Sequence, residues 1–210
     1  MPLLYSGPVS DLPVSLPPDL ALRLSGALDR ESKIVRGLEA LGPIAGRDVL
    51  LVDAEQSSIG AGLVSLGARL VHVPLSEPLR LSAADGSMDV VVGLWSAFRG
   101  IDPSELAEVD RVLRPDGRLL VVHDYGRDDV SRLLGERPEH GAWSRRNGPF
   151  LSSGFRVRVI HCWWDFDSLE AATEFLGEAF GNPGATLGAT LKRPRLSYKV
   201  AIYHRSRSTA

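Results

Sequence analysis

The chain has 210 residues, 44% hydrophobic and 24% charged, a mixture that is typical of one globular domain and excludes disordered, collagen-like and coiled-coil chains. Its formal net charge of −2 argues against a nucleic-acid partner, and the lack of any apolar run of ~18 residues argues against a membrane partner. The single cysteine, Cys162, excludes an internal disulfide and favours a reducing, cytoplasmic location.

Five prolines mark the first 18 residues, and they predict an extended N-terminal arm (residues 1–18), either loose or draped over the domain. Residues 20–41 then follow a helical pattern, which Gly42 and Pro43 end. We expect residues 19–210 to form a single α/β domain.

From residue 48 onward, short apolar segments alternate with amphipathic ones. The predicted strands are 48–52, 69–75, 88–94, 119–122, 155–166 and 196–204. The predicted helices are 58–66, 103–114, 127–134 and 169–180, and the predicted loops are 135–153 and 182–195. This alternation predicts a doubly wound, mostly parallel sheet of six strands, the last of them antiparallel.

A family resemblance is carried by residues 85–122. The stretch DGSMDVVV at 85–92 resembles DGSFDVVV of the class I S-adenosylmethionine-dependent methyltransferases, and ELAEVDRVLRPDGRLLVV at 105–122 resembles the helix, turn and strand that follow it there. The resemblance spans residues 30–205 and implies a Rossmann-like methyltransferase fold. Only about ten residues separate Leu75 from Gly86, where the family usually has another helix and strand, so we expect a shortened first half.

The cofactor motif of the family is degenerate in this chain. The family's first strand ends in an acidic residue and a glycine-rich turn, whose glycines let the backbone approach the cofactor. Here the turn falls on residues 53–57, which contain no glycine, and Leu51 takes the acidic position of the strand. Pro74 stands where the family has the acidic residue that holds the ribose. The resemblance therefore implies a remodelled or lost site, and we predict no cofactor, with S-adenosylmethionine as the alternative.

Polar side chains follow the carboxyl ends of the predicted strands, where doubly wound sheets bind ligands. The densest group is 123–129, in which His123 and Tyr125 are the predicted catalytic residues, because a histidine can exchange protons near neutral pH. A strand-end turn that caps the next helix is the alternative for this group. The candidates for cofactor binding are Asp53, Glu55, Ser57 and Trp95, and those for substrate binding are Arg99, Asp124, Arg127 and Trp143.

Each of these candidates also has a purely structural interpretation. Asp53 and Glu55 would belong to a solvated loop, Trp95 to the core, and Trp143 to a loop with one packed aromatic ring. The histidines show no ligand spacing, so we predict no metal site.

Two functions remain open on the sequence. The first is a methyltransferase-like binding or interaction module, with a small-molecule ligand and a homodimer through the terminal strands or the arm as its expected partners. The alternative is an active S-adenosylmethionine-dependent methyltransferase that acts on a small molecule.

Overall fold

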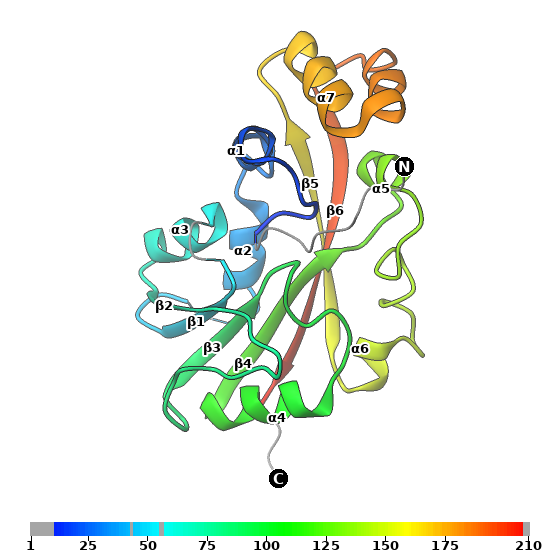
Figure 1. Cartoon of the computed structure of the whole chain (residues 1–210). Coiled ribbons are helices and arrows are strands. Elements are labelled where there is room, and N and C mark those ends of the chain that lie inside the picture. Colours follow the sequence, from blue (N-terminus) through cyan, green and yellow to red (C-terminus); the bar gives the residue numbers. More distant parts are fainter. Residues whose placement is uncertain (1–10, 43, 55–56, 208–210) are drawn as a thin grey trace.

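A six-stranded sheet forms the centre of the computed structural model, which describes residues 11–42, 44–54 and 57–207 (Figure 1). The strands are β1 Asp48–Val52, β2 Arg69–Val73, β3 Met88–Gly93, β4 Leu113–Asp124, β5 Arg156–Asp165 and β6 Arg195–Ser206. They lie in the order β2-β1-β3-β4-β6-β5. The four strands β1 to β4 pair in parallel, and β6 is antiparallel to both β4 and β5. The prediction of a mostly parallel α/β sheet with an antiparallel last strand is confirmed.

Helices cover both faces of the sheet, as expected for strands whose side chains are apolar in both directions. Their bounds are α1 Pro18–Ala27, α2 Lys33–Glu39, α3 Ser58–Ser65, α4 Pro103–Val112, α5 Asp129–Leu134, α6 Pro149–Ser152 and α7 Leu169–Gly188. Buried residues of α1, α2, α3, α5 and α7 join one hydrophobic cluster, and those of α4 and α6 join the other. No helix among the described residues is long and apolar enough to cross a membrane.

The first half of the sheet is short, as the resemblance implied. Strand β2 is an edge strand, and residues 74–87 connect it to β3 without a helix or strand. Helix α4 holds this connection in place. Glu108 accepts a hydrogen bond of 2.8 Å from the backbone of Leu81, and Arg111 donates to the carbonyl oxygens of Leu81 and Ala83. The side chains of this segment, Leu79 and Leu81, fill the space on the α4 face.

The prediction of one helix over 20–41 is wrong, because residues 28–32 are not helical and separate α1 from α2. Asp29 and Ser32 have positive φ angles of 50° and 53°, outside the right-handed helical region. The Asp29 carboxylate instead accepts a hydrogen bond of 2.7 Å from the backbone N–H of Ile34, near the start of α2. Leu28, which lies between the two helices, forms an antiparallel β-bridge with Trp164 of the edge strand β5. This bridge holds the segment between α1 and α2 against the edge of the sheet.

The loop predicted at 182–195 is also partly wrong. Gly181 does break the helix, with φ 60° and ψ −139°, but α7 resumes after this kink and continues to Gly188. Pro183 is tolerated there because the first turn of a helix does not need its backbone N–H. In Figure 1, α7 lies at the far end of β5 and β6, which extend beyond the other strands. The predicted loop at 135–153 contains the short helix α6, and the helix predicted from residue 127 begins at Asp129.

Candidate functional site

The predicted site residues follow the ends of β1, β3 and β4, at Val52, Gly93 and Asp124. We call this end of the parallel sheet the carboxyl edge. Trp95 and Asp124 meet there although 29 positions separate them: the Trp95 indole Nε1 donates to the Asp124 Oδ1 at 3.0 Å. The Tyr198 hydroxyl of β6 donates to the same oxygen and lies 3.0 Å from the indole nitrogen. All three side chains are buried, so this carboxylate is held by two donors inside the protein.

The second oxygen of the same carboxylate faces the loop 135–148. Asp124 Oδ2 has no hydrogen-bond partner, but it lies 3.6 Å from His140 Nε2 and 3.9 Å from Arg137 Nη1. Burial alone would lower the pKa of His140. The Asp124 and Glu139 carboxylates outweigh burial and raise this pKa.

Arg99 and Glu139 form an ion pair beside this group, in which the Glu139 carboxylate is buried and Arg99 is partly exposed to solvent. Arg99 Nη2 donates to Glu139 Oε1 at 2.8 Å, and Arg99 Nη1 donates to the carbonyl oxygen of Trp95 at 3.0 Å. The guanidinium also lies 5.8 Å from the ring centre of Trp143. Burial would raise the pKa of Glu139, but the Arg99 guanidinium holds it below its usual value. The structure therefore brings together three of the predicted substrate residues: Arg99, Asp124 and Trp143.

His123 lies beneath these residues and has no exposed surface. Its Nε2 is 2.9 Å from the Phe98 carbonyl oxygen, and its ring packs edge-on against Trp143 with centroids 4.9 Å apart. Burial lowers the pKa of His123 to about 4, so the imidazole is neutral near pH 7. The geometry is that of a packed core histidine, and its catalytic role stays a prediction.

Two further candidates lie away from the buried group. The Tyr125 ring is half-buried against the cluster on the α4 face, and its backbone N–H donates to the Lys199 carbonyl at 2.9 Å. Arg127 is exposed, has a φ of 60°, and uses its carbonyl to accept a hydrogen bond from the Lys199 ammonium. All four candidates are neighbours in the sequence, but His123 and Asp124 are buried whereas Tyr125 is half-buried and Arg127 is exposed.

Two of the cofactor candidates, Asp53 and Ser57, form hydrogen bonds within the protein. Asp53 has a φ of 56°, and its backbone N–H donates to the Val73 carbonyl oxygen at 2.8 Å. The Ser57 hydroxyl caps α3 by accepting from the backbone N–H groups of Ile59 and Gly60. Glu55 lies outside the described residues.

The arm reaches the same edge of the sheet. The Asp11 carboxylate lies near the Ser57 hydroxyl and the backbone N–H of Ser58, both of which lower its pKa, but burial outweighs them and raises it. Two residues farther along the arm, the Pro13 carbonyl oxygen accepts a hydrogen bond of 3.1 Å from Arg137, which lies in the loop after α5.

The residues between and beside these two anchors are apolar and buried. Leu12 and Val14 are 3% and 6% exposed, and they belong to the same hydrophobic cluster as Ala54, Leu94 and Trp95. In Figure 1 the dark blue segment before α1 descends from that helix toward the end of β4. Residues 11–14, which we call the arm segment, therefore lie across the carboxyl edge from α3 to the loop 135–148. The sequence left open whether the arm was loose or draped, and this part of it is draped.

The family resemblance implies an S-adenosylmethionine site at these residues, and several of them make contacts within the protein instead. The arm segment packs with the ends of β1 and β3, and Ser57 is committed to α3 and Asp11. Pro74, which follows β2, offers neither a side-chain acceptor nor a backbone N–H to a ribose. The Trp95 indole is 2% exposed and bonded to Asp124.

Sequence reasoning missed Glu139, His140 and Tyr198, and it did not place the arm at the carboxyl edge. Tyr198 lies within a predicted strand, whose pattern indicates only that the residue is buried. Glu139 and His140 lie in the segment 135–153, which the sequence predicts to be a solvated loop. A faint signal was available: an acid and a histidine stand side by side in a loop that also contains Trp143.

Comparison with solved structures agrees with this fold. A protein named as a type II methyltransferase from Anaeromyxobacter dehalogenans superposes with a TM-score of 0.53 and 18% identity, over 84% of this chain and 96% of that one. A protein named as a methyltransferase from an antibiotic biosynthesis pathway of Anabaena variabilis gives a TM-score of 0.52 and 13% identity, over 87% and 99% of the two chains. No protein-family model matches the sequence, and no curated protein matches it. The chain therefore has the Rossmann-like fold of the class I methyltransferases.

Proposed function

We propose that this chain is a methyltransferase-fold protein that does not bind S-adenosylmethionine in the usual way, and that it acts as a binding or interaction module. One observation carries the proposal. The arm segment lies across the carboxyl edge with Leu12 and Val14 buried, in the place where a doubly wound sheet binds its ligand. A ligand would have to displace about two buried aliphatic side chains, each worth roughly 1.5–3 kcal/mol of apolar burial.

The departures of this sequence from the family's cofactor-binding motif support the same proposal independently. The turn at 53–57 contains no glycine, and Pro74 replaces the residue that would hold a ribose. Moving the arm segment aside would therefore uncover a surface that still lacks the family's binding loop. As partners we propose a small molecule of unknown class and a second copy of the chain, paired through one of the edge strands β2 or β5.

The alternative is an active S-adenosylmethionine-dependent methyltransferase whose site opens when the arm segment leaves. Its support is the buried pair of carboxylates at the carboxyl edge. Asp124 Oδ2 and Glu139 Oε2 are each buried without a hydrogen-bond partner, as expected of groups that could bind a polar ligand.

The test is calorimetric titration of the full chain with S-adenosylhomocysteine. The wild type is compared with Leu12→Asp, which places a charge where the arm segment is buried, and with Leu22→Asp as the matched control. Leu22 is 76% exposed, so the control adds the same charge without disturbing the packing.

Absence of binding below about 1 mM in all three proteins supports the proposed function. Micromolar binding by the wild type overturns it. Micromolar binding by Leu12→Asp alone favours the alternative, in which the arm gates a working site. Circular dichroism of each variant shows that the chain is folded when the titration is made.

A further inference from the structure

Helix α2 covers part of one face of the sheet, and beyond the end of this helix the described residues leave that face open as a pocket. Over the middle of this face the packing is close: a Cβ on Gly37 would lie 2.8 Å from Ile160 Cδ1 and 3.0 Å from Ile202 Cδ1. Helix α2 ends at Glu39, and the Arg118 guanidinium donates to the carbonyl oxygen of Leu41 just beyond it.

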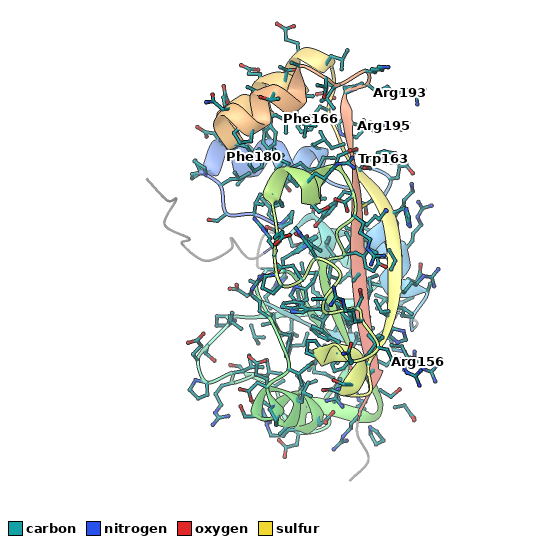
Figure 2. All side chains as sticks on the ribbon, turned by 90° about the vertical axis from the view of Figure 1, so that its right-hand side faces the viewer. Arg156, Trp163, Phe166, Phe180, Arg193 and Arg195 are labelled. Carbon is teal, nitrogen blue, oxygen red and sulfur yellow. The ribbon has the colours of Figure 1, made fainter. Side chains whose placement is uncertain are left out.

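The strand register places four basic side chains on this open part. His204 of β6 is opposite Leu120 of β4 on one side and opposite Arg156 of β5 on the other. Because side chains alternate along a strand, the even-numbered residues of these paired parts of β4, β5 and β6 lie on the same face of the sheet as Ile160 and Ile202. The basic residues on that face are Arg118, Arg156, Arg158 and His204. Figure 2 shows Arg156 at the lower end of β5, far from Trp163 and Arg195 at the other end of the same pair of strands.

A pocket of about 480 Å³ lies beside three of these side chains, those of Arg118, Arg156 and His204. Its lining residues are Arg118, Ser153, Gly154, Arg156, His204, Arg205 and Ser206. None of them is acidic. Arg205 is neutralised by Asp110, at 2.9 Å, whereas Arg118, Arg156 and Arg158 form no ion pair with any residue that the structure describes.

The charge on this face is therefore not compensated. Burial lowers the pKa of His204, and the three arginines Arg118, Arg156 and Arg158 lower it further. Guanidinium groups that have no carboxylate partner and line a concave site favour an anion, and their planar forks match the oxygens of phosphate.

We infer that this pocket binds the phosphate group of a small phosphorylated molecule, with Arg118 and Arg156 as the main charged ligands and the Ser153 and Ser206 hydroxyls as further donors. Its volume lies within the roughly 300–1,000 Å³ that small-molecule pockets occupy. A small ligand is favoured over nucleic acid because the whole chain carries a net charge of −2. The pocket lies at the opposite end of β4 from Asp124, so this site is independent of the function proposed for the carboxyl edge.

The experiment is calorimetric titration of the full chain with inorganic pyrophosphate in low salt. Arg156→Gln is the first test variant because Arg156 is exposed on an edge strand and holds no other group, so its loss leaves the fold intact. The double variant Arg118→Gln/Arg156→Gln is the second. Arg145→Gln/Arg146→Gln is the control, since both arginines are exposed and the change in net charge is the same.

We expect the wild type and the control to bind pyrophosphate equally, within about twofold, and the double variant to bind at least about tenfold more weakly, with Arg156→Gln between them. Parallel titrations with glucose 6-phosphate and adenosine triphosphate distinguish a sugar phosphate from a nucleotide, and tighter binding of either also supports the site. No binding of any of the three at millimolar concentration overturns the inference. An equal loss in the control overturns it too, and so does tighter binding of a single-stranded oligonucleotide at the same phosphate concentration.

Discussion

Arg137 and Pro13 are 124 positions apart in the chain and joined by one hydrogen bond, from the guanidinium to the carbonyl oxygen at 3.1 Å. This bond ties the arm segment to the loop that closes over the carboxyl edge. The Asp11 carboxylate lies near Ser57 and Ser58, so polar groups face the segment at both of its ends. The position of the arm is thus specified by polar contacts as well as by the burial of Leu12 and Val14.

Removing the Arg137 guanidinium is expected to loosen the arm segment. Arg137→Ala removes one hydrogen bond of about 1 kcal/mol, so amide exchange over residues 11–16 should become about fivefold faster. Hydrogen–deuterium exchange with mass spectrometry measures this directly. Arg145→Ala, in the same loop but exposed, is the control; equal exchange in both variants would mean that the bond does not hold the arm.

The burial of Leu12 should be visible in the stability of the whole domain. Leu12→Ala creates a cavity where the side chain is 3% exposed, and we expect the free energy of unfolding to fall by about 2–5 kcal/mol. Leu22→Ala, at 76% exposure, should change it by less than about 0.5 kcal/mol. Urea denaturation compares the two. A small effect at position 12 would show that the arm segment contributes little to folding.

The Tyr198 hydroxyl is expected to matter more than that of Tyr125. Tyr198→Phe removes a buried donor to the Asp124 carboxylate, at a cost of about 1.5–3 kcal/mol because the acceptor is charged. Tyr125→Phe removes a hydroxyl at a half-buried position and should cost less than about 0.5 kcal/mol. Thermal or chemical denaturation of the two variants gives the comparison. Equal losses would contradict the hydrogen-bond network at the carboxyl edge.

Acid should destabilise the protein through His123. Its folded pKa of about 4 lies below the unfolded value of about 6.5, so the unfolded chain binds more protons between these values. The contribution of His123 to the free energy of unfolding is complete above about pH 6.5 and is lost as the pH falls toward 4. From pH 7 to 4.5 the loss amounts to about 2 kcal/mol.

The check is urea denaturation of the wild type and His123→Phe across that pH range. His140 and the carboxylates titrate in both proteins, so the difference between them isolates His123. The variant should show a flatter dependence on pH by about 2 kcal/mol. Parallel curves would mean that the imidazole of His123 is accessible to solvent, which would favour the catalytic role predicted from the sequence.

The sequence by itself determined the elements whose signals are local. Apolar runs placed strands within a few residues of β1, β2 and β3, and Asp102 with Pro103 predicted the start of α4. The short spacing between Leu75 and Gly86, set against the family that the sequence resembles, predicted the missing strand and helix. Each of these depends on neighbours in the chain, which the sequence shows directly.

Only the tertiary structure decided how the candidate site is built. The bonds from Tyr198 to Asp124, from Arg99 to Glu139 and from Arg137 to Pro13 join residues 74, 40 and 124 positions apart. No periodic pattern records such contacts. For the same reason His123 could not be told from an exposed strand-end histidine, since its burial depends on the loop that carries Trp143. A polar residue at the end of a strand has the same local signal whether solvent or another segment covers it, and here distant segments cover it.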